Sequence, residues 1–316
     1  MGKRWLGVLR VVVSAGALAF LFWKIGLGET LSVLRHARPL YLAVAFGLYV
    51  GSLLVRAYRW FLLIRSLDAG VTFGRLWRLY FVGQFFSSFL PSQFGGDVVR
   101  ALELTQNTES AAAVGTVLLD RMSGLLVLFA IGLAVLPFNA ARMAPWLVGL
   151  LVAVAGGGLL VGGLVLEGRL LRRLTRRLPP LLSLEGEGPL ARVYAAVTGC
   201  GRRAVTGAFT VSLLFNVINV VINYLCGRAV GAEVSLGYFF VVTPLLSVSG
   251  LIPSVGGWGV REAVSTAVFT PVGVGANTAA ALGMALGGIT LTAGLLGGGL
   301  YLVEGLRRAG GREAGR

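Results

Sequence analysis

Residues 86–104 read FSSFLPSQFGGDVVRALEL, and residues 251–264 read LIPSVGGWGVREAV. Both stretches contain Pro, Ser, a pair of Gly, Val and Arg in the same order and at similar spacing. The apolar run before each motif is too short to cross a bilayer, and Pro and Gly then interrupt the helix. A helical pattern resumes afterwards with a charged residue. The two motifs therefore predict a pair of broken, re-entrant helices that form two halves of one site.

The composition of the chain indicates a membrane protein. Of its 316 residues, 56% are hydrophobic and 13% are charged, and the mean hydropathy is +0.83. Several apolar runs of about 20 residues are long enough to cross a hydrocarbon core about 30 Å thick. The 47 Gly suit helices that approach one another closely in lipid. The net charge of +15 lies mainly at the ends of these runs, which favours anionic lipid headgroups over nucleic acid as partners.

We predict an all-α polytopic membrane protein with about six full spans and two broken re-entrant helix pairs. The full spans are expected at residues 11–25, 40–64, 111–136, 146–166, 205–230 and 277–303. A cleavable signal peptide is the alternative for the first span, because Ala15-Gly16-Ala17 resembles a cleavage site. Apolar residues continue to Ile25, however, and favour a retained span.

The distribution of Lys and Arg predicts that both termini are cytoplasmic, in the inner membrane of a bacterial-type cell. Most of the 28 basic residues, including Arg56 and Arg59, are assigned to the cytoplasmic side, and 305–316 forms a basic cytoplasmic tail. The first re-entrant pair then enters from the cytoplasm and the second from outside. Residues 1–137 and 138–304 would form two inverted repeats, with which many secondary transporters build a site that is reachable from either face.

The central loop at residues 167–203 is the most basic part of the chain and contains RLLRRLTRRLPP from Arg169. Arg and Leu alternate there at mixed helical spacing up to Leu178. This part is expected either to lie in the headgroup plane as an amphipathic helix or to be a solvated charged loop.

Arg100 and Arg261 are predicted to bind an anionic headgroup. A helix N-terminus offers unpaired N–H donors and a partial positive charge, and Arg adds a planar donor fork, which together suit a phosphate. Asp97 can cap the helix that follows the first motif. The other substrate-binding candidates are small residues of the two motifs: Ser92, Gly95, Gly96, Ser254, Gly256, Gly257 and Gly259.

The alternative is structural: Gly and Pro only kink the helices, and Arg100 and Arg261 pair with Asp97, Glu103 or Glu262. Ionisable residues within a membrane cost at least about 2.5 kcal/mol each and are usually functional, so binding is favoured. The same three carboxylates are the candidates for coupling to a proton or sodium gradient.

Other polar residues lie within the predicted spans. Asp120-Arg121 is interpreted as a local ion pair that fixes helix packing, with a proton or ion relay as the alternative. Three asparagines share one face of the fifth span: Asn216, Asn219 and Asn223. Interhelical hydrogen bonding is favoured over headgroup contact for them, and Gln84 has the same two interpretations.

The sequence contains no motif for most of the chemistries that soluble enzymes carry out. Neither Lys3 nor Lys24 lies in a P-loop, and no HExxH metal site or GxSxG nucleophile motif is present. We therefore expect no catalytic residue, no metal and no cofactor.

These motifs resemble the transmembrane family of the lysylphosphatidylglycerol synthases, also called flippase-like domain proteins. The family pattern is matched at residues 83–86, 90–100 and 252–262, and Asp120-Arg121 before Gly124-Leu125 is similar to its third-span motif. In two-part members the membrane region is joined to a soluble aminoacyl transferase domain, and flipping of the aminoacylated lipid is assigned to the membrane part. These 316 residues contain no such domain, so we expect no synthase activity.

The resemblance implies a flippase or scramblase for an anionic phospholipid or polyprenyl phosphate, driven downhill or by an ion gradient. Some stand-alone members are linked to lipid-linked sugar pathways and labelled glycosyltransferases, but no DxD-like motif supports that here. The alternatives are a membrane-embedded transferase that acts on a lipid-linked substrate, and a membrane subunit that scaffolds a partner. Glycines of the last span suit packing within one protomer or between protomers, so a homo-oligomer is left open.

Overall fold

The computed structural model describes residues 32–90, 94–105, 108–176, 184 and 188–313. The described residues form helices and no strand. Five of these helices are long and apolar enough to cross a membrane: α3 (Pro39–Arg65), α6 (Ser110–Val135), α7 to α8 (Pro145–Glu167), α11 (Gly201–Ala229) and α14 (Ala276–Glu313). They agree with five of the six predicted spans. The predicted span at 11–25 lies outside the described residues.

Local sequence explains where several of these helices begin and end. Pro39 and Pro145 stand in the first turns of α3 and α7 (Pro145–Leu151), where a missing N–H costs nothing. A π-helical segment at Val152–Gly156 joins α7 to α8 (Gly157–Glu167). Gly168 then ends α8 with a φ of 71°, a left-handed conformation that glycine adopts without strain.

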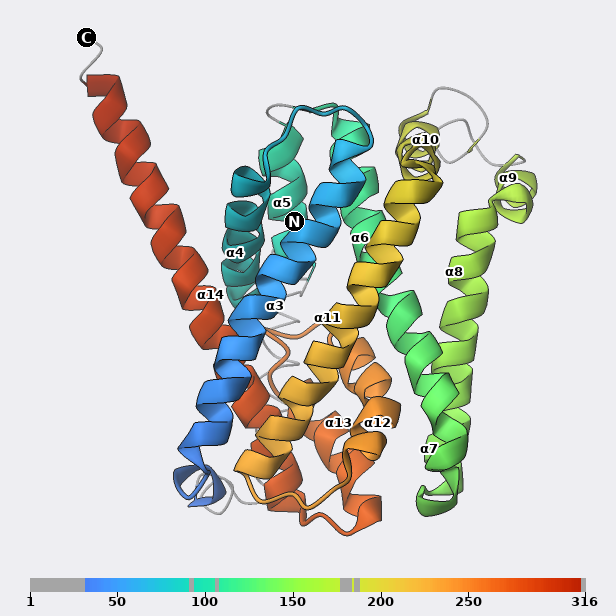
Figure 1. Cartoon of the computed structure of the whole chain (residues 1–316), viewed down its shortest axis with the longest axis vertical. Coiled ribbons are helices and arrows are strands. Elements are labelled where there is room, and N and C mark those ends of the chain that lie inside the picture. Colours follow the sequence, from blue (N-terminus) through green and yellow to red (C-terminus); the bar gives the residue numbers. More distant parts are fainter. Residues whose placement is uncertain (1–31, 91–93, 106–107, 177–183, 185–187, 314–316) are drawn as a thin grey trace, which may run out of the picture.

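Four shorter helices form two pairs at opposite ends of the bundle. α4 (Phe73–Phe89) and α5 (Gly95–Thr105) lie in the upper half of Figure 1, and α12 (Leu236–Ser249) and α13 (Val260–Phe269) lie in the lower half. α4 has 17 residues, and α12 has 14 residues. At 1.5 Å per residue their lengths are about 26 Å and 21 Å, less than a hydrocarbon core of about 30 Å. Neither pair therefore contains a helix long enough to cross a bilayer.

The two short pairs are held by the long helices in matching ways. α3 packs along α11 through the middle of the bundle. α6 packs on α5 of the first pair and α12 of the second, whereas α14 packs on α4 of the first pair and α13 of the second. Each of α6 and α14 thus contacts one helix from each pair.

Glycines of α14 make its contact with α4 close. A Cβ on Gly297 would lie 1.9 Å from the carbonyl oxygen of Phe81, and a Cβ on Gly294 would lie 2.7 Å from Ser88 Oγ. These glycines of the last span therefore serve packing within the chain. Gly288 and Gly299 have no atom within 4 Å of such a Cβ.

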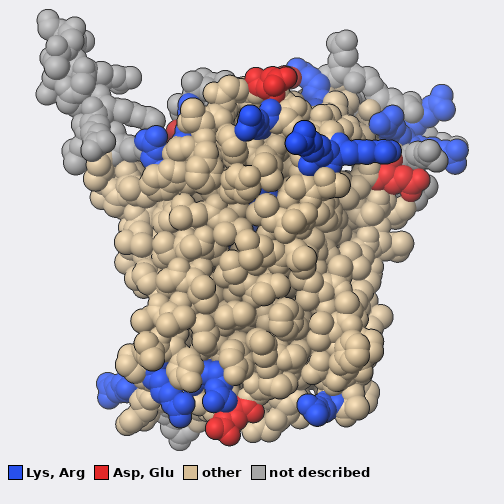
Figure 2. Space-filling view, in the orientation of Figure 1, with Lys and Arg blue, Asp and Glu red and all other residues tan. Residues whose placement is uncertain are grey.

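Charged side chains lie at the two ends of the face shown in Figure 2, and the belt between them is almost free of charge. The central basic loop contains two short helices, α9 (Arg169–Thr175) and α10 (Pro189–Gly199), at the upper end of Figure 1. α10 packs on α6. Short 3-10 turns at Leu136–Phe138, Ala140–Arg142 and Thr270–Val272 lie at the ends of longer helices.

Candidate functional site

A cavity of about 270 Å³ lies at the centre of the bundle, between the long helices and both short pairs. α5 contributes Arg100 to its lining, and α13 contributes Arg261, as the paired motifs predicted. The lining that the structure describes contains five arginines and two aspartates: Arg56, Arg59, Arg100, Arg121, Arg261, Asp97 and Asp120.

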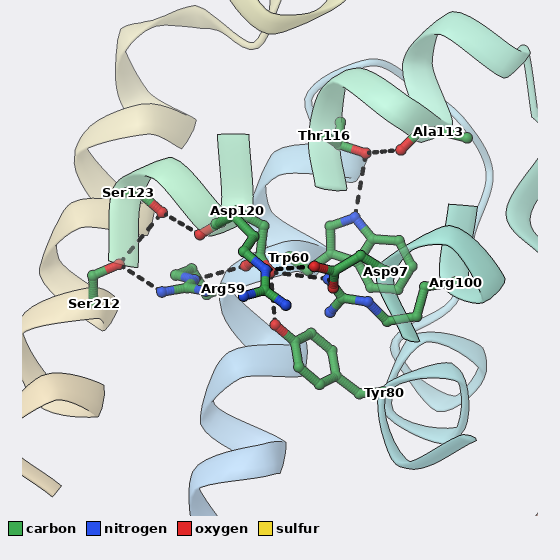
Figure 3. Close-up of polar contacts among 11 residues, drawn as sticks. Arg59, Trp60, Tyr80, Asp97, Arg100, Ala113, Thr116, Asp120, Ser123 and Ser212 are labelled. Carbon is green, nitrogen blue, oxygen red and sulfur yellow. Dashed lines mark hydrogen bonds and ion pairs between the residues drawn. The ribbon is translucent and has the colours of Figure 1, made fainter. Parts of the chain in front are cut away.

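Asp120 is fully buried and is bound by side chains from three other helices (Figure 3). Arg59 Nε donates to its Oδ1 at 2.7 Å, and the Tyr80 hydroxyl donates to its Oδ2 at 2.6 Å. Arg100 Nη2 lies 3.5 Å from the same Oδ2. Arg59 also donates to Ser212 Oγ at 3.0 Å, which extends the network to α11. One carboxylate therefore ties together α3, α4, α5 and α6.

Asp97 lies between two guanidinium groups. Its Oδ1 accepts from Arg100 Nη2 at 2.7 Å, and its Oδ2 accepts from Arg121 Nε. Asp97 is the third residue of α5, and whether it also caps this helix stays a prediction. The predicted local pair of Asp120 with Arg121 is wrong, because each side chain has its partner on another helix.

Arg100 is 3% exposed and lies against aromatic rings. Its guanidinium carbon is 4.0 Å from the ring centre of Tyr80 and 4.9 Å from that of Trp60. Trp60 is fixed in turn by its Nε1, which donates to Thr116 Oγ1 at 3.2 Å. Such ring faces stabilise a cation without neutralising it.

Glycines provide the space for three of these arginines. A Cβ on Gly83 would lie 2.8 Å from Arg100 Cγ, and a Cβ on Gly124 would lie 2.6 Å from Arg59 Nη1. On the other side, a Cβ on Gly287 would lie 2.8 Å from Arg261 Nη1. Any larger side chain at these positions would displace a guanidinium group or its stem.

Arg261 and Glu262 have separate roles. Arg261 Nη2 donates to the Gly256 carbonyl oxygen at 3.0 Å. Glu262 is fully buried, and its Oε2 accepts from the Gly259 N–H at 2.6 Å, which caps α13. Of the pairs named in the structural alternative, Arg100 with Asp97 is present, whereas Arg261 hydrogen-bonds to Gly256 and not to Glu262.

Some of the other predicted residues line the cavity, and the rest lie outside its lining. Gly96, Gly256, Gln84, Asn216, Asn219 and Asn223 line the cavity. Asn216 Nδ2 donates to the Gly124 carbonyl oxygen at 2.9 Å, which confirms an interhelical hydrogen bond. Gln84 Nε2 likewise reaches the Thr290 carbonyl oxygen at 3.4 Å.

The remaining predicted residues are not part of the cavity lining: Gly95, Gly257, Gly259, Ser254, Glu103 and Glu262. Gly257 and Gly259 have φ of 82° and 81°, so they shape the turn before α13 rather than contact the cavity. Ser254 is 2% exposed and donates to the Ile252 carbonyl oxygen at 3.3 Å. Ser92 lies outside the described residues. No group of three or more His, Cys, Asp and Glu that could hold a metal occurs in the described part of the chain.

Arg56 and Arg59 lie deeper than predicted, since the prediction placed them on the cytoplasmic side or at the span end that faces it. They stand nine and six residues before the end of α3 at Arg65, about 14 Å and 9 Å inside it at 1.5 Å per residue, and both line the cavity. Tyr80 was missed as well. The depth of Arg56 and Arg59 within the apolar span could have identified this part of the site, because an arginine two turns inside a span needs a partner there.

The fold and the cavity define a multi-pass helical membrane protein with a buried, arginine-rich site. The chain belongs to the family described as the lysylphosphatidylglycerol synthase TM region, which matches residues 7–298. Two proteins of Methanothermobacter thermautotrophicus, each called a UPF0104 membrane protein, are 26% and 25% identical to this chain. These alignments cover 84% and 87% of the chain and 85% and 88% of the relatives. The family resemblance drawn from the motifs is thereby confirmed.

Proposed function

We propose that this protein is a flippase or scramblase that moves an anionic lipid headgroup across the inner membrane while the lipid tails stay in the bilayer. The observation that carries the proposal is the central cavity, to which the two broken motifs contribute Arg100 and Arg261. An arginine-rich cavity inside an apolar bundle has little use in structure alone, because buried cations without partners are costly.

The arrangement of helices supports alternating access through two inverted repeats with six spans. The α4–α5 pair lies in the upper half and the α12–α13 pair in the lower half, and α6 and α14 make matching contacts with both pairs. The cavity lies where the two pairs meet. Rocking of one repeat against the other would expose it to each face in turn.

Several finer features belong to the same proposal. Both termini are cytoplasmic, which the basic central loop at the upper end supports. Transport runs downhill or on a proton or sodium gradient, with Asp97, Glu103 or Glu262 as the coupling carboxylate. Among the carboxylates that line the cavity, Asp97 is the more accessible, since its side chain is 16% exposed and that of Asp120 is 1% exposed.

The test is transbilayer movement of labelled lipids in proteoliposomes. Arg261→Ala removes a cavity cation that has no carboxylate ligand among the described residues, so this variant should fold and lose transport. Arg100→Ala should lose transport too. Exposed Arg142, in the turn before α7, provides the matched control, and Arg142→Ala should move lipid as the wild type does.

Transport retained in both cavity variants would refute the headgroup role of these arginines. Turnover of a radiolabelled lipid-linked donor by the pure protein, without lipid movement, would favour the alternative of a membrane-embedded transferase. In the cavity, Asp97 and Asp120 are both bound to arginine, which leaves neither carboxylate ready to act as a general base.

A further inference from the structure

We propose that the cavity selects a compact headgroup with about two negative charges, a phosphate monoester or a pyrophosphate. It would discriminate against phosphodiester headgroups and against aminoacylated headgroups of net positive charge. This inference rests on the proposed transport function and names the chemical class of its substrate.

The net charge of the cavity lining favours an anion with about two negative charges. Five arginines and two aspartates among the described residues leave a net charge of +3. Buried Glu262 lies beside Arg261 but outside the lining, and counting it lowers the net charge to +2. A phosphate monoester carries about −1.5 to −2 at pH 7, which is close to what the cavity needs for neutrality. A phosphodiester supplies only one negative charge.

Some arginines of the cavity lining have a carboxylate partner and others have none among the described residues. Arg59 is bound by Asp120 and Arg121 by Asp97, so these two cations are compensated within the protein. Arg100 shares the same two carboxylates. Arg56 and Arg261 have no carboxylate within 4.0 Å in the described structure. The positive charge without a carboxylate partner therefore lies on α3 and α13.

Several arginine N–H donors in the cavity lining lack a hydrogen-bond partner among the described residues. Nε and Nη2 of Arg56, Nε and Nη1 of Arg100 and Nη1 of Arg261 are all buried without a hydrogen-bond partner among the described residues. Buried donors of this kind are normally satisfied, so these five are available to an anion that accepts several bonds. A phosphate monoester offers three strong acceptor oxygens, and a pyrophosphate offers more.

Aromatic rings surround the guanidinium group of Arg56. Its guanidinium carbon is 5.1 Å from the ring centre of Phe215, 5.5 Å from Tyr80 and 5.7 Å from Tyr49. Arg56 and Arg100 thus lie against the same Tyr80 ring. Two cations near one ring repel each other, and an anion bound between them would reduce this repulsion.

The size of the cavity suits a small anionic group. At about 270 Å³ it is slightly smaller than typical ligand pockets of about 300–1,000 Å³. This volume is enough for a phosphate or a pyrophosphate group. An ammonium group beside five arginines would in addition be repelled.

The experiment is equilibrium binding to the purified full chain in detergent, followed through its thermal stability. The probes are farnesyl phosphate, farnesyl pyrophosphate, phosphatidylglycerol, lysylphosphatidylglycerol and inorganic pyrophosphate. We expect both farnesyl phosphates to bind at least about tenfold more tightly than either phospholipid. Inorganic pyrophosphate should compete with them, but more weakly, because it lacks the chain that stays in the apolar phase.

Variants identify the residues that set the preference. Arg56→Gln and Arg261→Gln should each weaken the binding of farnesyl pyrophosphate about tenfold and that of phosphatidylglycerol much less. The double variant should lose the preference for the doubly charged headgroup. Neither change leaves a carboxylate unpaired, so melting temperatures without ligand should stay near that of the wild type. Arg142→Gln, at an exposed position, is the control and should bind as the wild type does.

Four outcomes separate this inference from the proposed function. Tighter binding and transport of phosphatidylglycerol or its lysyl ester would overturn the headgroup class and leave lipid transport standing. Binding of farnesyl phosphates without movement of any lipid would overturn transport and support the anion class. Inorganic pyrophosphate that binds as tightly as the farnesyl esters would assign the site to a soluble phosphate and overturn the lipid substrate. Binding of no phosphate probe to folded protein would overturn the inference.

Discussion

Arg59 and Asp120 form a fully enclosed ion pair, with 2.7 Å between Nε and Oδ1 and side chains that are 4% and 1% exposed. The pair joins α3 to α6 across 61 positions of sequence. Since Asp120 also accepts from Tyr80 and lies near Arg100, this carboxylate holds the cations of the cavity in place. The pair therefore links two helices of the bundle and lies beside Arg100.

Removing the charge of Asp120 should destabilise the protein strongly. Asp120→Asn keeps the shape but leaves Arg59 buried without its anion, a change that typically costs about 3–5 kcal/mol. We expect a large fall in melting temperature in detergent. The double variant Arg59→Met, Asp120→Leu should be more stable than Asp120→Asn, because it leaves neither charge alone. A melting temperature of Asp120→Asn equal to that of the wild type would contradict the role given to this pair.

Gly83 lies against the side chain of Arg100, so a substitution at Gly83 can move that side chain without changing any charge. In Gly83→Ala the new Cβ would come within 2.8 Å of Arg100 Cγ, so the guanidinium must shift. We expect lipid transport to fall severalfold while the protein still folds. Gly47→Ala in α3 is the control, because nothing lies within 4 Å of its Cβ. Equal transport by Gly83→Ala and Gly47→Ala would show that the position of Arg100 is unimportant.

The contact of α14 with α4 depends on Gly297. In Gly297→Ala the Cβ would lie 1.9 Å from the backbone oxygen of Phe81, which cannot move without shifting α4. Overpacking of this kind costs about 1–3 kcal/mol or more, so the melting temperature should fall. Gly299→Ala, two residues on, meets no atom within 4 Å and should melt as the wild type does. If the two variants melt alike, the close approach of these helices is not required.

Periodicity and length were enough to predict the five described spans, because a run of about 20 apolar residues has few other uses. The two short pairs were predicted from Pro and Gly, which break helices by a local effect. Arg100 and Arg261 were found because the motif that contains them occurs twice. The arrangement of the two halves as inverted repeats stays a prediction.

The errors arose where long-range contacts override local rules. Asp120 and Arg121 are neighbours in the sequence, but Asp120 binds Arg59 and Arg121 binds Asp97. Arg56 and Arg59 were counted with the cytoplasmic charges, because a count by sequence cannot see depth or a partner 61 residues away. Such partners are visible only once the helices are placed side by side.

The proposed topology can be tested by cysteine labelling. Ser66 follows α3 at the upper end of the bundle, and Glu233 lies between α11 and α12 at the lower end; both are exposed. With Cys226 replaced, a membrane-impermeant maleimide applied to intact cells should label Glu233→Cys and not Ser66→Cys. Cys200 is replaced as well, because Ser66 makes a side-chain hydrogen bond to its thiol and a cysteine at position 66 would lie within reach of it. Labelling of Ser66→Cys alone would reverse the orientation that the basic residues predict. Labelling of both from outside would contradict the three crossings, α6, α7 to α8 and α11, that separate the two positions.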